Sequence, residues 1–294
     1  MLSLHTNFAS LSAQTSLGRT QTALSTSQTR LSTGHRINSA MDDAAGLQIA
    51  TRLKAQTSGM AVAMRNTQNA TSMLQTGEGA FDEVSSMLSR MKDLATQAAD
   101  GSSSSDDRTA MQAEYDALGN QLTQVMSNTS FAGMNLLSGG TSAGALASAL
   151  TFQIGATTSE TFTLDLSAGF TAMQAAFTAI SSNYSDTGAA GTAAGTELAD
   201  GSSASALIDQ LSTALTAVGT VRSALGAAAN RLDHIYNNLQ NQSTNTTQAA
   251  SRIMDVDYAT ETANQTTQSM LAQAGTAMLK QSGQMSQMVM SLLQ

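Results

Sequence analysis

Histidine side chains and paired acids are the groups of this chain best suited to metal binding or acid–base chemistry. The three histidines, His5, His35 and His234, are far apart and have no metal-ligand spacing, and no H-E-x-x-H motif occurs. Asp42 and Asp43 stand together just ahead of a long segment of periodic apolar residues. We interpret these two acids as charges at a helix N-terminus, and we expect no catalytic histidine.

A second pair of acids, nearer the C-terminal end, imitates the start of a calcium-binding loop. Asp255 and Asp257 have the first spacing of such a loop, but no glycine or closing glutamate follows at the required offsets. We predict instead that they cap the last helix or pair with Arg30 or Arg36. The chain also has no cysteine, which excludes thiolate and disulfide chemistry. The sequence therefore predicts no catalytic, cofactor or metal site, and no enzyme.

Composition narrows the class of protein further. The 294 residues carry a net charge of −8, and no basic stripe is present to neutralise phosphates, so nucleic acid is not an expected partner. No window approaches the length of apolar sequence that spans a membrane. The opening residues lack the pattern of a cleaved secretory signal, so a secreted chain would need another route. The chain contains no proline, which favours long uninterrupted helices.

Apolar residues recur at helical spacing at both ends of the chain. Near the N-terminal end they step by four and three positions and then, after a slip of one residue in register, by seven, and near the C-terminal end they follow an a/d heptad. Lys280 is the only charge after residue 261. A helix with so narrow a stripe is marginal in water, so we expect the two stripes to pair and to fold only on assembly. The predicted assembly stripe comprises Leu4, Phe8, Leu11, Leu17, Leu24, Leu31, Leu271, Ala274, Met278, Met285, Met288 and Leu292.

Longer helices are predicted inside these ends. The segment from about Ala44 to Ala99 reads as one rod, with a break expected near Gly77–Gly79. Ser105 or Asp106 is expected to cap the helix that follows. The strongest periodicity lies between residues 204 and 242, where two rows of apolar residues each repeat every seven positions. These rows are Leu211, Val218, Leu225, Leu232 and Leu239, and Leu207, Ala214, Val221, Ala228 and Ile235.

The middle of the chain lacks this helical pattern. Two short alternating runs, Thr151–Ile154 and Thr161–Leu166, predict a β-hairpin, and residues 181–203 read as a short variable loop or linker. The expected fold is mainly α, a bundle of long coiled-coil helices with a small β-hairpin region. Its discontinuous domains are built from N- and C-terminal segments. The predicted domains are 1–43 with 254–294, and 44–180 with 204–253.

Six segments of the sequence resemble a known family, the bacterial flagellins, in order and at both ends. They are LSTGHRINSAMDDAAGLQIATRL (31–53), FAGMNLL (131–137), FQIGATTSETFTLDL (152–166), NRLDHIYNNLQNQ (230–242), AASRIMDVDYATE (249–261) and MLAQAGTAMLKQ (270–281). The resemblance covers about the first 140 and the last 90 residues. It implies an inner domain of two terminal helices and a second helical domain with the hairpin. Only a short variable middle remains, too short for a full outer domain.

The resemblance also implies a function and partners. The subunit would polymerise with itself into the filament of the bacterial flagellum for motility, outside the cell. It would be exported unfolded by the flagellar type III system. Expected partners are the flagellar cap proteins, the hook–filament junction proteins and an export chaperone at the C-terminal helix. One alternative is a hook–filament junction protein, which has similar ends. A signalling coiled coil of the chemoreceptor type is another, but no membrane span or input domain supports it.

A host partner follows from the same resemblance. In flagellins of this type the flagellin-sensing Toll-like receptor of animals binds the long helix of the second domain. The positions that carry over are Arg90, Leu94 and Glu114. Arg90 and Leu94 share a helical face because they are four residues apart. Heptad spacing predicts that both lie at the margin of the core stripe, free for a partner.

Overall fold

The computed structural model describes residues 7–139, 142–185, 191 and 194–292, with backbone alone for 138–139, 142–143 and 285–292. The fold is mainly α, as predicted. Its helices are α1 (Phe8–Thr33), α2 (Ala44–Ala99), α3 (Ser105–Asn128), α4 (Ser167–Ile180), α5 (Gly201–Met254) and α6 (Tyr258–Leu292), with a short 3-10 helix η1 (Ala145–Ala147). Three antiparallel strand pairs join them: β1 (Ser130–Phe131) with β2 (Met134–Asn135), β3 (Ser138–Gly139) with β4 (Ser142–Ala143), and β5 (Leu150–Gln153) with β6 (Thr161–Leu164).

The described residues form two compact units. The terminal unit takes the residues up to Thr57 and those from Thr244 onward, and the central unit takes Ser58–Ser243. The long helices α2 and α5 contribute to both units. Each unit is described below by itself.

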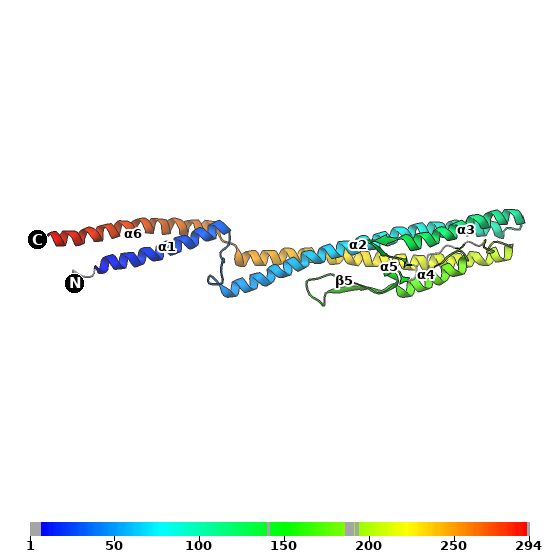
Figure 1. Cartoon of the computed structure of the whole chain (residues 1–294), viewed down its shortest axis with the longest axis horizontal. Coiled ribbons are helices and arrows are strands. Elements are labelled where there is room, and N and C mark those ends of the chain that lie inside the picture. The colour runs from blue at the N-terminus through cyan, green and yellow to red at the C-terminus, as the bar shows by residue number, and fades with distance from the viewer. Residues whose placement is uncertain (1–6, 140–141, 186–190, 192–193, 293–294) are drawn as a thin grey trace. The chain divides into compact units, whose positions relative to one another are not determined.

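In the terminal unit, α1 and α6 run side by side and antiparallel (Figure 1). At one end the Asn7 side-chain amide donates to the carbonyl oxygen of Ser282 at 3.2 Å. At the other end the Val256 backbone N–H donates to the carbonyl oxygen of Gly34 at 3.0 Å. Gly34 ends α1 with a φ of 74°, a left-handed conformation that glycine adopts without steric cost. The tie at Gly34 sets the register of the two helices.

Small residues let α1 and α6 approach. A Cβ added to Gly275 would lie 3.4 Å from Leu17, which places the Gly275 face of α6 against α1. Ala272 and Leu279 are three residues before and four after Gly275, so they share this face, and both are half-buried. No apolar side chain of α1 or of the described part of α6 is fully buried, so the pair has no closed core of its own and is weakly held by burial alone.

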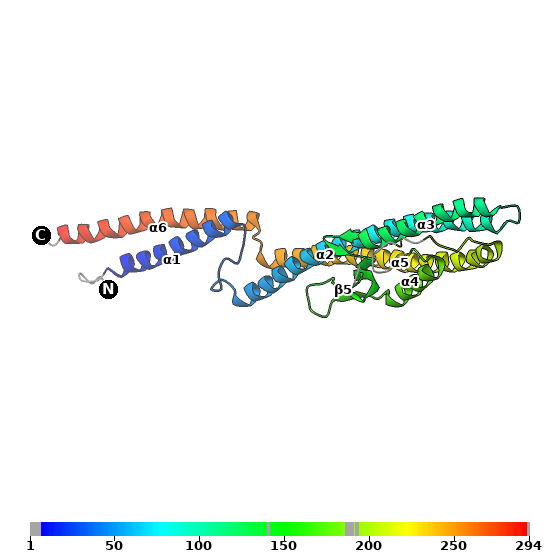
Figure 2. The same ribbon diagram turned by 45° about the vertical axis from the view of Figure 1, so that its right-hand side comes forward.

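The central unit is built on the antiparallel pair α2 and α5, with α3 and α4 beside them (Figure 2). Both predicted heptad rows of α5 face inward: every member is buried except Ile235, which is half-buried. Arg222 of α5 adds a polar clamp to α2, with 2.8 Å to Glu78 and 3.2 Å to Asp82. Because a seven-residue repeat keeps one stripe facing a partner helix, the periodicity correctly predicted this core.

Two details of the predicted helices are wrong. No break occurs near Gly77–Gly79, because α2 is continuous from Ala44 to Ala99. Gly77 is buried, and a Cβ there would lie only 3.1 Å from Leu146, so the glycine serves close packing. The N-cap of α3 is Ser104, not Ser105 or Asp106. Ser104 and Asp107 form a reciprocal capping box, which satisfies two backbone N–H groups at once.

The middle of the chain contains the predicted hairpin and one helix that the sequence analysis missed. Strands β5 and β6 pair in the register Leu150↔Leu164 to Gln153↔Thr161. Directly after them comes α4, whose Phe170, Met173 and Phe177 are buried. Phe170 packs edge-on against Phe81 of α2 at 5.7 Å between ring centroids. The middle segment therefore completes the core of the central unit.

Candidate assembly surface and receptor patch

An exposed apolar row runs along α6. Leu271, Ala274 and Met278 of the predicted stripe are exposed, and Met270 joins them. The expectation that this row pairs with the N-terminal stripe is wrong, because the neighbouring Ala272, Gly275 and Leu279 row faces α1 instead. The two rows are adjacent on the surface of α6. With the Ala272, Gly275 and Leu279 row toward α1, the heptad row of Leu271, Ala274 and Met278 stays exposed.

The predicted stripe on α1 divides into two parts. Leu17, Leu24 and Leu31 are half-buried, whereas Phe8 and Leu11 are exposed. Leu4 lies outside the described residues, and so do the side chains of Met285, Met288 and Leu292. The terminal unit thus leaves apolar side chains uncovered on each of its long helices.

Charged groups lie close together where α1 ends and α6 begins. Arg30 lies 3.9 Å from both Asp42 and the buried Glu261. Backbone N–H groups of Ser39 and Asn38 donate to Asp42 and lower the pKa of that carboxyl. This cluster anchors one end of the pair and leaves the exposed rows nearly without charge.

The acids singled out in the sequence have structural roles. Asp43 accepts from the Gly46 backbone N–H at 2.8 Å, at the start of α2 as predicted. Asp257 accepts from the Ala259 backbone N–H and the Thr260 hydroxyl, so it caps α6 as predicted. These hydrogen bonds lower the pKa of Asp257, with the bond from Thr260 contributing most.

Asp255 contacts a histidine, and the histidines that the structure describes do not gather into a site. Asp255 lies 3.4 Å from His35, so the predicted partners Arg30 and Arg36 are wrong for it. His5 lies outside the described residues, and His234 is exposed on α5. Among the residues that the structure describes, no group of three or more histidines and acids is placed to hold a metal.

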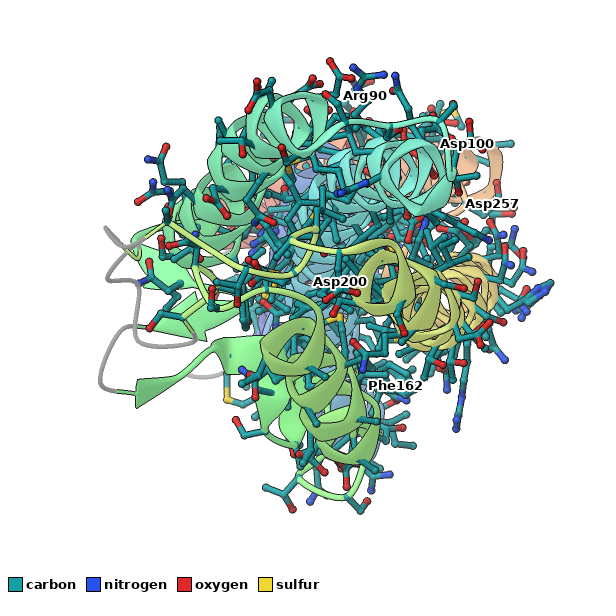
Figure 3. The ribbon with its side chains drawn as sticks, turned by 90° about the vertical axis from the view of Figure 1, so that its right-hand side faces the viewer. Arg90, Asp100, Phe162, Asp200 and Asp257 are labelled. Atoms are coloured by element: carbon teal, nitrogen blue, oxygen red, sulfur yellow. The ribbon has the colours of Figure 1, made fainter. Side chains whose placement is uncertain are left out.

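The predicted receptor patch is only partly exposed. Arg90 and Glu114 are half-exposed and joined by an ion pair, with Nη2 2.7 Å from Oε1, and Figure 3 shows Arg90 at the outer surface of the bundle. Leu94 is only 2% exposed. The expectation that Leu94 is free for a partner is therefore wrong, because Leu94 belongs to the main core of the central unit.

A polar network that the sequence analysis missed holds Ser182, Glu197 and Leu198 against α3. The Gln112 amide nitrogen donates to Glu197 at 2.8 Å, and its oxygen accepts from the Leu198 N–H at 2.7 Å. Ser182 donates its N–H and hydroxyl to the same carboxylate. Leu198 and Tyr184 are buried. The described parts of this predicted linker are therefore packed, and Leu198 was the apolar residue that could have indicated it.

The network also sets the ionisation of its members. Burial opposes ionisation of Glu197, but the hydrogen bonds from Ser182 and Gln112 outweigh burial and lower its pKa. Burial, with the nearby charges of Glu197 and Asp116, raises the pKa of Tyr115. The Tyr115 hydroxyl stays protonated and donates to the carbonyl oxygen of Ile180 at 2.6 Å.

Acid should loosen this network. Because the folded pKa of Glu197 is lowered, its contribution is complete above the ordinary glutamate pKa of about 4.3 and is lost as pH falls through the folded value. We expect Glu197→Gln to lower the urea midpoint at pH 7 and to lose less than wild type between pH 6 and pH 3. Glu83→Gln, at an exposed position of α2, is the control and should match wild type. Parallel pH profiles of Glu197→Gln and wild type would contradict the role of Glu197.

A helical subunit with uncovered apolar rows on both terminal helices has the surface expected of a self-assembling structural protein. Comparison with known proteins agrees. The family model of the bacterial flagellin N-terminal helical region matches residues 4–142, and that of the C-terminal helical region matches residues 208–293. The chain belongs to the bacterial flagellin family.

Individual relatives match over the whole chain. The flagellin of Halalkalibacterium halodurans is 35% identical over 290 residues, which is 99% of each chain. Flagellin A of Vibrio anguillarum is 34% identical over 378 residues and is covered completely, as is this chain. The crystal structure of Bacillus cereus flagellin shares 31% identity, covers 63% of this chain and 94% of that chain, and gives a TM-score of 0.48.

The family defines the role of the chain. It is a structural subunit that polymerises with itself into the extracellular filament of the flagellum. The alternative of a hook–filament junction protein is less supported, because the full-length relatives are flagellins. In the described part of the chain, no helix combines the length and the apolar character needed to cross a membrane.

Proposed function

We propose that the exposed rows of α1 and α6 are the surfaces that neighbouring copies of the chain cover in the filament. The observation that carries the proposal is the row Met270, Leu271, Ala274 and Met278, which is apolar, exposed and left uncovered by α1. Other copies of this chain are the occupant, because the protein is a filament subunit and an open helical array binds through unlike surfaces of one subunit. Because neighbouring copies carry the same sequence, an apolar surface without charges also avoids repulsion between like charges at their contact.

A charge placed in this row tests the proposal. Leu271→Glu would force a carboxylate into an apolar interface, and an unpaired buried charge is costly. We expect seeded filament elongation by this variant to fall by at least about tenfold, which is 1.4 kcal/mol or more of lost interaction. Electron microscopy and light scattering measure the growth.

The matched control uses the same charge on another face of α6. Gln273 is exposed and lies two residues from Leu271, outside the apolar row. Gln273→Glu should elongate near the wild-type rate. Equal growth of Leu271→Glu and wild type would remove the α6 row from the assembly surface.

Export is part of the same proposal. We infer that the chain is secreted unfolded through the flagellar type III system, with an export chaperone covering the α6 row in the cytoplasm. Three observations support this: the weak burial between α1 and α6, the exposed row itself, and the scarcity of charge along α6. Helices that gain most of their burial from neighbours need not be folded before assembly. The flagellar cap and the hook–filament junction proteins would meet the same terminal helices at the filament ends.

A host receptor is the last proposed partner. We propose that the flagellin-sensing Toll-like receptor binds the patch formed by Arg90 and Glu114, with the buried Leu94 supporting α2 beneath it. Nη2 and Nε of Arg90 both contact Oε1 of Glu114, at 2.7 and 2.8 Å, and hold the planar guanidinium at the surface. Arginine in such a position is a common energetic anchor of interfaces.

Removing the anchor should weaken signalling. We expect soluble Arg90→Ala monomer to need at least about tenfold more protein than wild type for a half-maximal receptor reporter signal, since an interface anchor contributes about 2 kcal/mol or more. Arg65→Ala, at another exposed arginine of α2, is the control. Wild-type monomer that gives no signal, or an Arg90→Ala variant as potent as wild type, would refute this patch.

A further inference from the structure

We propose that Met270 and Met278 form an oxidation site through which a peroxide reversibly stops filament growth. The inference rests on the proposed assembly surface, because it makes the same α6 row sensitive to chemical modification. Met270 is 58% exposed and Met278 is 67% exposed. With Ala274 between them at four-residue steps, they lie along one side of α6.

Exposure separates these two methionines from those of the core. Among the methionines with described side chains, those of the central unit are mostly buried: Met60, Met73, Met87, Met91, Met111, Met126 and Met173. Oxidation of methionine follows access of the oxidant to the thioether sulfur. Met270 and Met278 should therefore react in the monomer while the core methionines stay reduced.

The reaction itself needs only a peroxide. The thioether sulfur attacks one oxygen of hydrogen peroxide and the O–O bond breaks. The proton of the attacked oxygen passes to the other oxygen, which leaves as water. The sulfur is oxidised by two electrons to a sulfoxide and the peroxide is reduced. Methionine sulfoxide reductases reverse the change, with one enzyme for each sulfoxide epimer.

The apolar residues around Met270 and Met278 explain why a sulfoxide at either position would weaken assembly. A sulfoxide is polar and accepts hydrogen bonds, whereas its neighbours on the exposed row are the hydrocarbon side chains of Leu271 and Ala274. Burial of a polar group without a hydrogen-bond partner is costly. In the proposed filament contact the opposing surface of a neighbouring copy is apolar as well, so a sulfoxide there finds few donors. Reduced methionine, by contrast, adapts its shape to an apolar contact.

The test begins with full-length monomer treated with hydrogen peroxide, after which catalase removes the oxidant. Peptide mass spectrometry measures the sulfoxide fraction at each methionine, and growth on untreated filament seeds measures assembly. We expect oxidised wild type to elongate at least about tenfold more slowly. Repair with both epimer-specific reductases should restore growth.

Two variants locate the effect. Met270→Leu/Met278→Leu keeps the row apolar but removes both sulfurs, so after peroxide it should elongate near its untreated rate. Met41→Leu removes a methionine that is 94% exposed outside α6, and it should remain as sensitive as wild type. Assembled filaments should form fewer sulfoxides at Met270 and Met278 than monomer does, while Met41 provides the comparison within the same sample.

Several outcomes would overturn the oxidation site. Normal growth of wild type that carries both sulfoxides is one. An equal loss of growth in the oxidised double leucine variant is another, because oxidation at some other methionine, such as the exposed Met134, would then be responsible. Failure of growth to return after confirmed repair is a third. Failure of the assembly surface itself is a different result, namely normal growth of untreated Leu271→Glu.

Discussion

Deletion of residues 271–294 is expected to leave a folded, soluble monomer that cannot elongate filaments. The deletion removes Leu271, Ala274 and Met278 from the proposed surface, together with the Gly275 face that meets Leu17. Burial of one leucine or methionine side chain contributes about 1.5–3 kcal/mol. Loss of several such contacts with each neighbour exceeds what filament growth can tolerate, since about 1.4 kcal/mol already changes affinity tenfold.

The central unit should survive this deletion. Its residues, Ser58–Ser243, contain none of the deleted segment, and its core is closed by α2, α3, α4 and α5. Circular dichroism and urea unfolding should show a cooperative transition near that of wild type, while electron microscopy shows no growth on wild-type seeds. Filaments of normal length from the truncated chain would contradict the prediction, and loss of the cooperative transition would show that the two units are not independent.

The heptad pattern predicted the central core well because one physical rule governs it. All members of the two rows of α5 except the half-buried Ile235 are buried, as a seven-residue repeat requires of a helix that faces one partner. The same rule failed on α6. There the face toward α1 is formed by small and half-buried residues such as Ala272 and Gly275, which carry too little hydrophobicity to stand out in a sequence.

Other features were hidden because they depend on residues far apart in the chain. The Gln112–Glu197 contact joins positions 85 residues apart, and neither residue type indicates burial by itself. Helix α4 is different, because Phe170, Met173, Phe177 and Ile180 recur at helical spacing and could have been recognised. The predicted N-cap residues of the helices were correct or one residue away, since capping depends on a few adjacent residues.

Leu94 shows how burial changes the interpretation of a functional prediction. Leu94→Ala is expected to destabilise the monomer by about 2–5 kcal/mol, the usual cost of truncating a buried leucine. The side chain is 2% exposed and belongs to the main core of the central unit. Urea unfolding of full-length monomer measures the change in the free energy of unfolding.

The matched control is Arg90→Ala, one helical turn away on α2. Its ion pair with Glu114 is half-exposed, and such pairs contribute about 1 kcal/mol or less, so this variant should unfold near the wild-type midpoint. A domain of ordinary stability has about 5–15 kcal/mol in total, so Leu94→Ala would raise the unfolded fraction while Arg90→Ala would not. Weaker receptor signalling by Leu94→Ala should then follow its loss of folded protein, whereas weaker signalling by Arg90→Ala should occur in fully folded protein. An equal and small change in stability for the two variants would show that Leu94 is not part of the core and would return it to the receptor patch.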